Sequence, residues 1–476
     1  MICCVLPGAA WAQEAAANGR IDALFSQWDH ADSPGCGVSV VQRGEAVFAR
    51  GYGSANLDYQ IPITPRTVFY LASVSKQFTA AAVALAAEQG HLSLDDDIRR
   101  WFPELQDYGS IIRVRDLVHH TSGLRDYLTL MSLAGMSYGD SWTSADILDL
   151  VARQRELNFA PRSDYLYSNT GYFLLAELIQ RATGVSLRRY TTREIFEPLG
   201  MSNTWFHDDA GQVIRDRAVS YANNGRGFRM SYLYNFDKVG SGGLYSTLED
   251  LARWDANFSA TRIGGPAFLE TMHRRGATER GTQLRYAFGL QHGSYRGQPT
   301  VEHGGSLMGF RTTMLRFPEE ETTVFVLCNL ASTDPERLAR QVADVVLAGQ
   351  LGSRRDGRSQ TTADTPTPEH RASEATASAY RQHADYEGSY FSQDLAVAYH
   401  VAARDDGLRL HWPRAESAEL IPFGDDAFRV RRSTVSLRFV REQGAVTGMI
   451  VDAGRARGLH FERQPIQTAA AGSDAG

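Results

Sequence analysis

Residues 71–80 of the chain read LASVSKQFTA. They begin an alanine-rich, largely apolar segment that runs to Gly90, and this composition predicts a helix that ends just before that glycine. Ser73 and Lys76 are three residues apart, so their side chains share one face of a helix. Of the 49 lysine and arginine residues, only Lys76 and Lys238 are lysines. The chain therefore keeps a lysine after Ser73 although it uses arginine at almost every other basic position.

A role in proton transfer would explain the choice of lysine at position 76. A serine hydroxyl becomes an effective nucleophile when a neighbouring base removes its proton. Lysine can be that base once burial or nearby cations lower its pKa toward ~7–8, whereas arginine, with a pKa above ~12, cannot. A helix N-terminus adds amides and a positive partial charge where an oxyanion could form. The pattern therefore indicates a candidate nucleophile, Ser73, and a candidate base, Lys76.

Two further segments carry groups that would complete such a site. Tyr167 and Asn169 lie just before a strongly apolar helical segment. A tyrosine beside a cation can act as a phenolate-like base or proton shuttle, and an asparagine can hold a substrate amide. The alternative interpretation is a packed tyrosine ring and an asparagine that caps the helix.

The second segment is HGGS at residues 303–306, which precedes a predicted strand. Gly304 and Gly305 would let a substrate approach the backbone edge closely. The backbone amide of Ser306 could then form an oxyanion hole together with that of Ser73. Alone, the sequence HGG is also typical of a turn before a strand.

Taken together and in this order, Ser-x-x-Lys, Tyr-x-Asn and a His-Gly-Gly box resemble the serine β-lactamase and penicillin-binding-protein superfamily. The closer resemblance is to its class C β-lactamase-like branch, which includes D-aminopeptidases, D-alanyl-D-alanine carboxypeptidases and esterases. The segments DLVHHTSGLRDY, EIFEPLGMSNTWF and VGSGGLYSTLEDLARW extend the likeness over roughly residues 21–330. The resemblance implies an α/β (α+β) transpeptidase fold, with an antiparallel sheet flanked by helices and a helical subdomain.

The resemblance also implies a role for each matching residue. Ser73 would be acylated, Lys76 would activate it, and Tyr167 would serve leaving-group protonation and deacylation. Asn169 would contact the substrate amide. The third box would line the substrate site, and the backbone amides of the nucleophile and of the box's serine would form the oxyanion hole.

His303 stands where true β-lactamases of this superfamily have a lysine, and a histidine is mostly neutral at pH 7. This difference argues against efficient β-lactam hydrolysis. It favours a serine hydrolase that acts on a small amide, a D-amino-acid peptide or an ester. The alternatives are a penicillin-binding or cell-wall receptor that acylates without turnover, and a true β-lactamase.

The chain divides into segments of different composition. Residues 1–12 resemble the end of a signal peptide and predict an exported, periplasmic or secreted protein. Residues 13–350 would form the hydrolase domain, 351–379 a polar linker, and 466–476 a disordered tail. Between them, residues 380–465 alternate in short strand-like segments, which predicts a small antiparallel barrel.

The barrel segment resembles the lipocalin-like domain appended to some superfamily members, D-aminopeptidases among them. This resemblance implies that a loop of the barrel could close the active site. An independent role in hydrophobic-ligand binding or self-association is the alternative.

Composition excludes several other classes. The net charge of −6 and the absence of a basic run argue against a nucleic-acid partner. No apolar segment approaches the ~20 residues needed to span a bilayer. Neither a metal-ligand spacing nor a nucleotide-binding loop is present, so we expect no metal and no cofactor. The oligomeric state is not indicated.

Several residues have more than one interpretation. Cys36 and Cys328 could form a disulfide if their strands are neighbours, but two buried, unpaired cysteines are favoured. Lys238 could line the substrate cleft, but a solvated loop lysine is the favoured interpretation. Arg311 would either anchor a substrate carboxylate or form a structural ion pair. His119 and His120 are interpreted as residues that pack within a loop.

Overall fold

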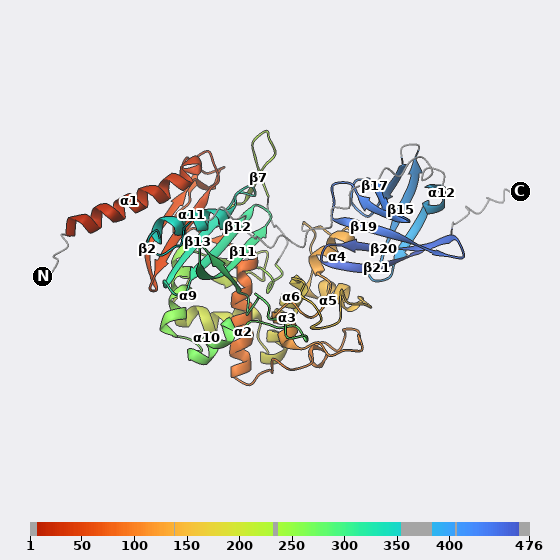
Figure 1. The fold of residues 1–476 in the computed structure, drawn as a ribbon, viewed down its shortest axis with the longest axis horizontal. Helices are drawn as coiled ribbons and strands as arrows, with labels where there is room; N and C mark the ends of the chain where they lie inside the picture. The colour runs from red at the N-terminus through yellow and green to blue at the C-terminus, as the bar shows by residue number, and fades with distance from the viewer. Residues whose placement is uncertain (1–6, 138, 232–236, 354–382, 405–406, 466–476) are drawn as a thin grey trace, which may run out of the picture.

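The structure is a computed structural model that describes residues 7–137, 139–231, 237–353, 383–404 and 407–465. It consists of a helix-flanked antiparallel sheet and a closed barrel that packs against one side of the helical region (Figure 1). Both predicted architectures are therefore confirmed.

The central sheet has the strand order β10-β11-β12-β13-β1-β2. Its strands are β1 (Cys36–Gln42), β2 (Glu45–Tyr52), β10 (Gln291–Tyr295), β11 (Gln298–Leu307), β12 (Phe310–Phe317) and β13 (Thr322–Cys328). The predicted hairpin between β1 and β2 turns at Arg43 and Gly44, which have φ angles of 52° and 80°. Strands from the beginning and the end of this region therefore form one sheet.

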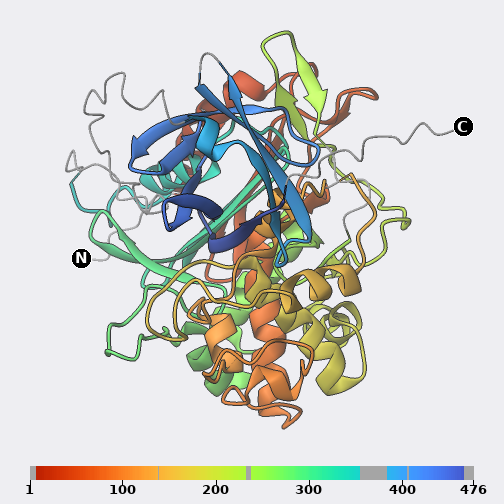
Figure 2. The same ribbon diagram turned by 90° about the vertical axis from the view of Figure 1, so that its right-hand side faces the viewer.

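Helices cover both faces of the sheet. On one face, α1 (Pro7–Phe25) and α11 (Pro335–Val346) pack their apolar side chains against β1, β12 and β13. On the other face, α9 (Leu248–Ala260) packs against β1, β2 and β13. Trp254 of α9 contacts Phe78 of α2 (Lys76–Glu88), with ring centroids 4.5 Å apart. Figure 2 shows the molecule from the side of the barrel. The 3-10 turn η2 (Ala72–Ser75) leads into α2 and contacts β11 and β12. This contact brings the Ser-x-x-Lys segment to the sheet.

The remaining elements of this part are short. The helices and helical turns are η1 (Ser26–Trp28), η3 (Ile98–Arg100), α3 (Val114–Val118), α4 (Tyr127–Leu133), α5 (Ser144–Ala152), α6 (Asn169–Thr183), α7 (Leu187–Thr191), η4 (Thr192–Phe196), α8 (Glu197–Leu199) and α10 (Gly265–His273). The small strands are β3 (Ser54–Asn56), β4 (Ile61–Pro62), β5 (Phe69–Tyr70), β6 (Trp205–Phe206), β7 (Tyr221–Asn223), β8 (Phe228–Met230) and β9 (Leu244–Ser246).

The second part is a closed antiparallel barrel preceded by α12 (His383–Tyr386). Its strands are β14 (Gly388–Ser392), β15 (Val397–Arg404), β16 (Gly407–His411), β17 (Ala418–Gly424), β18 (Ala427–Val430), β19 (Val435–Glu442), β20 (Ala445–Ala453) and β21 (Ala456–Arg463). Alternate side chains of these strands point inward, as in small barrels generally. Buried aromatic rings such as Tyr390, Tyr399 and Phe461 fill the interior.

Cys36 and Cys328 form a disulfide. They face each other in the register of the antiparallel neighbours β1 and β13, with their Cα atoms 4.0 Å apart. The favoured interpretation of two unpaired cysteines is therefore wrong. The pairing depends on two strands that meet although the cysteines are 292 residues apart in sequence, and the composition gives no sign of it.

The predicted segment boundaries fall largely outside the described residues. Most of the predicted linker at 351–379 and all of the predicted tail at 466–476 lie there, and the description resumes with residue 383. The predicted leader at 1–12 overlaps the start of α1, so export stays a prediction. Across the described ranges, no helix is both long and apolar enough to cross a membrane.

Candidate active site

The turn η2 presents Ser73 to the site. Ala72, just before it, has a φ of 50°, in the left-handed region that residues with a side chain rarely adopt. Such backbone strain is often found at functional sites. Ala72, Val74 and Ser75 are buried, whereas Ser73 is partly exposed. The turn therefore fixes its buried residues in the core and leaves the hydroxyl of Ser73 accessible.

Lys76 is the first residue of α2, and its side chain is completely buried, with 0% of the residue exposed. Its Nζ donates to Oδ1 of Asn169 at 2.9 Å and to the carbonyl oxygen of Ser241 at 2.6 Å. Its third neighbour is Oγ of Ser73, at 3.3 Å. The predicted approach of Ser73 and Lys76 is therefore present in the structure.

The orientation of the Asn169 amide is fixed by its other partner. Its Nδ2 and its backbone N both donate to Oδ2 of Asp126, at 2.8 and 2.6 Å. A carboxylate only accepts from these groups, so Oδ1 of Asn169 must face Lys76. The carbonyl of Ser241 also only accepts. Two N–H bonds of the Lys76 amine are therefore committed, and the remaining position, a lone pair in the neutral amine, faces Ser73.

Electrostatics favour the neutral amine. Burial lowers the pKa of Lys76 well below its ordinary value, and the positive charge of Arg455 lowers it further. The carboxylate of Asp126 acts in the opposite direction but does not outweigh burial. Desolvation penalises the charged form of a buried amine, which is the physical basis of this shift. A neutral amine beside a serine hydroxyl has the arrangement that a general base requires.

Tyr167 lies beside the amine of Lys76 and the guanidinium of Arg455. Its ring centroid is 4.8 Å from Nζ of Lys76 and 4.8 Å from Cζ of Arg455. Its hydroxyl oxygen is buried and has no well-formed hydrogen bond to another described residue. Burial raises the pKa of Tyr167, while the nearby Ser73 hydroxyl and Arg455 act in the opposite direction. The tyrosine is therefore protonated at rest, which suits a proton donor better than the phenolate-like base considered from the sequence.

His303 is a buried, neutral residue behind Tyr167. Its Nδ1 lies 2.7 Å from the carbonyl oxygen of Gly304, which can only accept, so Nδ1 carries the proton. Its Nε2 then accepts from the hydroxyl of Tyr286 at 3.0 Å. Burial lowers the pKa of His303 to about 3. The structure therefore agrees with the prediction that this position lacks the positive charge of a lysine.

Gly304 and Gly305 belong to β11, and backbone packing requires a glycine at the second position. A Cβ at Gly305 would lie 2.3 Å from the carbonyl oxygen of Leu71 and 3.1 Å from the backbone N of Ser73. A Cβ at Gly304 would meet only the carboxylate end of the Glu336 side chain, which is partly exposed and can move away. The glycine at 305 therefore lets β11 approach the turn that carries the nucleophile.

Ser306 follows on the same strand. It is exposed and pairs with Arg311 of β12. Strand β10 pairs with β11 only between residues 298 and 302, so β10 leaves the edge of β11 beyond Glu302 uncovered. This uncovered edge contains the third box and faces the turn η2.

Sequence reasoning missed four contributors to the site: Asp126, His120, Arg455 and the carbonyl of Ser241. The ring of His120 lies 4.3 Å from that of Tyr167, and its Nδ1 accepts from the backbone N of Ser168 at 3.1 Å. Burial lowers the pKa of His120 well below its ordinary value. Three of the four lie in segments quoted for the family resemblance, so that resemblance was the available signal. The fourth is in the barrel, where no signal marked it.

The residues with open interpretations are also placed. Lys238 is buried, with 8% exposed, and pairs with Asp237, so the solvated-lysine interpretation is wrong. Arg311 donates to the carbonyls of Met308 and Phe310, both at 2.8 Å. His119 packs its ring against Phe288, as interpreted. Within the described ranges, no three His, Cys, Asp or Glu side chains are grouped to hold a metal ion.

Comparison with known proteins gives the family. A family model described as "Beta-lactamase" matches residues 21–348, more than half of the chain. The protein belongs to the β-lactamase family. The superfamily predicted from the three boxes is thereby confirmed.

Two curated relatives illustrate the likeness. The protein is 28% identical to penicillin-binding protein 4* of Bacillus subtilis (strain 168), over 87% of this chain and 92% of the relative. It is 30% identical to the D-aminopeptidase of Gluconobacter oxydans (strain 621H), over 67% of this chain but only 59% of that relative. The match to D-aminopeptidases of this type thus spans less than two thirds of their length.

Solved structures extend the comparison to the barrel. A D-amino acid amidase from Ochrobactrum anthropi SV3, in complex with L-phenylalanine, matches with a TM-score of 0.60 and 26% identity, over 70% of this chain and 99% of that one. An octameric penicillin-binding protein homologue from Pyrococcus abyssi matches with a TM-score of 0.61 and 22% identity, over 94% of this chain and 99% of that one. At 22% identity, the match to the Pyrococcus abyssi structure shows only a shared fold, and it extends over both the sheet-containing part and the barrel.

Proposed function

We propose that the protein is a serine hydrolase that forms an acyl-enzyme on Ser73. The observation that carries this proposal is the environment of the Lys76 amine. Two of its neighbours are oxygens that can only accept, burial disfavours its charge, and its third neighbour is the hydroxyl of Ser73. Such an amine can accept the proton of the serine hydroxyl at neutral pH. An arginine at position 76 could not, because it stays protonated.

The proposed reaction follows from these contacts. As Oγ of Ser73 bonds to the substrate carbonyl carbon, its proton moves to Nζ of Lys76. The backbone amides of Ser73 and Ser306 stabilise the negative oxygen of the tetrahedral intermediate. The bond to the leaving group then breaks, Tyr167 donates a proton to the leaving group, and the Lys76 ammonium returns a proton to Tyr167. Water hydrolyses the resulting ester and releases the free enzyme.

The substrate class that we propose is a D-amino-acid peptide or amide, with small esters as simpler substrates. The names of the D-aminopeptidase and D-amino acid amidase relatives support this class. We expect only weak activity on β-lactams. True β-lactamases have a positively charged lysine at this position, whereas His303 is neutral. Asn169, which orients Lys76, would contact the substrate amide through its remaining N–H.

We also propose that the protein works outside the cytoplasm. The Cys36–Cys328 disulfide supports this location, since disulfides persist in oxidising compartments and are rare in the cytosol of most organisms. The small-residue pattern that ends at Ala12 supports it independently.

Labelling with a fluorophosphonate probe tests the proposed function. The wild-type protein should form a covalent adduct on Ser73, identified by peptide mass spectrometry, and Ser73→Ala should form none. The wild-type protein should also turn over D-amino-acid anilides and nitrophenyl esters. Absence of an adduct would contradict the nucleophile, and a stable adduct without turnover would favour an acylated receptor instead.

A further inference from the structure

The segment 158–168, which contains Tyr167, is bound to the residues that follow α3. The backbone N of Asn158 donates to the carbonyl oxygen of Gly123 at 2.8 Å, and that of Arg162 donates to the carbonyl oxygen of Thr121 at 2.7 Å. The segment itself forms neither helix nor strand. These contacts, rather than regular secondary structure, therefore place the segment.

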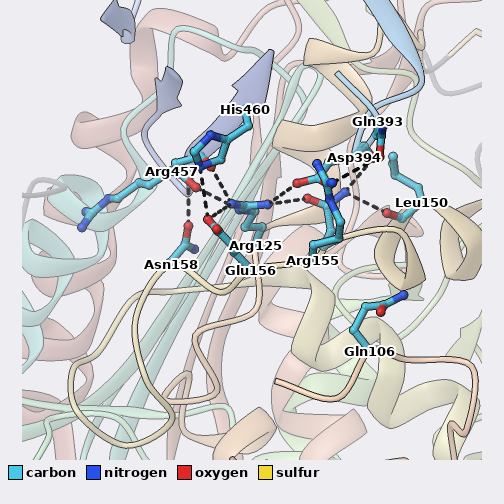
Figure 3. A network of polar contacts seen from close by, with 12 residues as sticks. Gln106, Arg125, Leu150, Arg155, Glu156, Asn158, Gln393, Asp394, Arg457 and His460 are labelled. Atoms are coloured by element: carbon cyan, nitrogen blue, oxygen red, sulfur yellow. Dashed lines mark hydrogen bonds and ion pairs between the residues drawn. The ribbon is translucent and has the colours of Figure 1, made fainter. Parts of the chain in front are cut away.

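The beginning of this segment is attached to the barrel. Oδ1 of Asn158 accepts from the backbone N of Arg457 at 2.9 Å. Arg125 lies beside this contact and donates to the carbonyl of Arg457 and to the carboxylate of Asp394, also in the barrel, both at 2.9 Å (Figure 3). The segment therefore starts from a fixed point at the junction of the two parts of the molecule.

One residue, His120, holds the backbone on both sides of Tyr167. The backbone N of Leu166 donates to the carbonyl oxygen of His120 at 3.1 Å, and the backbone N of Ser168 donates to Nδ1 of its ring, also at 3.1 Å. The centroid of the same ring lies 4.3 Å from that of the Tyr167 ring. His120 is only 1% exposed. A single buried residue therefore contacts the tyrosine ring and both of its flanking peptide groups.

The hydrogen bond from Ser168 determines the form of the imidazole. A backbone N–H can only donate, so Nδ1 of His120 is the unprotonated nitrogen and Nε2 carries the proton. Burial lowers the pKa of His120 well below its ordinary value, because desolvation disfavours the imidazolium. The acceptor that holds Ser168 is therefore present at neutral pH.

The backbone of His120 adopts a conformation that disfavours a side chain. Its φ is 59°, in the left-handed region, and it lies just past the end of α3. Its backbone N donates to the carbonyl of Leu117 at 3.4 Å, and that of Thr121 donates to the carbonyl of Asp116 at 2.9 Å. Glycine is the usual residue at this position of such a helix end. The side chain of His120 therefore serves a purpose other than ending the helix.

We propose that His120 is a positioning residue that aims the hydroxyl of Tyr167 at the leaving group of the substrate. In the proposed function, on which this inference rests, Tyr167 donates the proton that the leaving group needs. The hydroxyl has no well-formed hydrogen bond to another described residue, so the ring and the backbone set its direction. These are the parts of Tyr167 that His120 contacts. A misplacement of about 1 Å in a reacting group can lower the rate by about 10²-fold.

Two substrates that share one D-amino acid but differ in leaving group test this inference on the full-length protein. A nitrophenolate leaves as a stable anion, whereas the nitrogen of an anilide must gain a proton as it leaves. His120→Gly suits the left-handed backbone and removes the ring. It should lower kcat/KM for the anilide by about 10–100-fold and leave kcat/KM for the nitrophenyl ester near the wild-type level. His120→Asn should restore part of the anilide activity, because its side-chain oxygen can replace Nδ1 and asparagine tolerates this backbone.

A double-mutant cycle with Tyr167→Phe is the decisive readout. Tyr167→Phe should cause the same selective loss on the anilide, and adding His120→Gly should lower kcat/KM little further, because the two residues act as one unit. His119→Asn is the matched control: this neighbouring histidine packs against Phe288, so the variant should keep the wild-type ratio of the two substrates.

Thermal melts of all variants check folding, and His120→Asn replaces His120→Gly in both comparisons where the glycine variant melts below the assay temperature. Equal losses on anilide and ester, or a full additional loss in the Tyr167→Phe background, would overturn the inference while Ser73 labelling persists. Loss of Ser73 labelling in the wild type would instead overturn the proposed function.

Discussion

Lys76 and Arg125 are two completely buried basic side chains that differ in charge. Lys76 is a neutral amine, whereas Arg125 is a charged guanidinium. The direct partners of Lys76 are the uncharged oxygens of Asn169 and Ser241. The direct partners of Arg125 include the carboxylate of Asp394. Both side chains are 0% exposed, so burial alone does not distinguish them.

The difference lies in the partner. A buried amine without a directly bonded carboxylate loses its proton more readily, because no ion pair offsets the desolvation of its charge. A buried guanidinium keeps its proton and therefore requires a carboxylate. The first arrangement suits proton transfer, and the second suits attachment of the barrel. Asp126 connects them, because it follows Arg125 in sequence and orients Asn169.

The largest expected effect comes from making position 76 resemble position 125. Lys76→Arg keeps a positive charge but cannot act as a base, so the rate of acylation should fall by about 10²–10⁴-fold. Hydrolysis of a nitrophenyl ester in pre-steady state measures this rate. The matched control is Lys238→Arg, which keeps its ion pair with Asp237 and should stay within about 2-fold of wild type. Activity of Lys76→Arg near the wild-type level would mean that Lys76 serves only as a cation.

The next effect comes from removing the charged partner of Arg125. Asp394→Asn has the same shape but leaves the buried guanidinium uncompensated, so we expect the free energy of unfolding to fall by about 3–5 kcal/mol. Urea denaturation measures this change. Asp149→Asn provides the contrast, because its pair with Arg153 is exposed and should contribute less than about 0.5 kcal/mol. Equal, small changes in both variants would show that the buried pair does not attach the barrel.

The stability of the protein at acidic pH tests whether His303, which lies near Lys76, is held neutral by the fold. The pKa of His303 in the folded protein is about 3, below its ordinary value of ~6.5. The unfolded chain therefore binds more protons between these values, and the stabilisation is complete above about pH 6.5 and is lost as the pH falls toward 3. From pH 6.5 to 5 we expect His303 alone to account for about 2 kcal/mol of lost stability.

Urea denaturation at both pH values, in wild type and in His303→Gln, measures that contribution. The variant has no titrating group at this position, so its stability should depend less steeply on pH. Buried His119, with a pKa of about 4, adds to the slope in both proteins and cancels in the comparison. Identical slopes would show that His303 is not held neutral by the fold.

The smallest expected effect concerns the second partner of Asp394. Arg155 also contacts this carboxylate, at 2.9 Å, but its side chain is 48% exposed. Solvent screens such a pair, so Arg155→Ala should cost about 1 kcal/mol or less. Urea denaturation beside Asp394→Asn provides the comparison. A loss as large as that of Asp394→Asn would mean that Arg155, rather than Arg125, carries the attachment.

Local relations in the chain could be predicted from the sequence. Ser73 and Lys76 are three residues apart, so one helical turn is enough to bring them together. The β1–β2 hairpin and the strand pattern of the barrel are local in the same sense. The scarcity of lysine marked position 76 without any structural knowledge.

Relations between distant segments could not be predicted in the same way. Arg455 lies in a turn between two barrel strands and reads in sequence as an ordinary solvated residue. Its role depends on how the barrel packs against Arg125 and Asn158, which no local pattern encodes. The disulfide between Cys36 and Cys328 depends likewise on which strands are neighbours in the sheet.

The protonation state of Lys76 is the central claim, and the chain offers a direct measurement of it. With only two lysines, lysine labelled with ¹³C at Cε gives two NMR signals, and Lys238→Arg assigns them. A pH titration should show Lys76 as a neutral amine at pH 8, with a midpoint well below that of an ordinary lysine. A Lys76 signal that keeps the chemical shift of an ammonium up to pH 10 would contradict its role as the base.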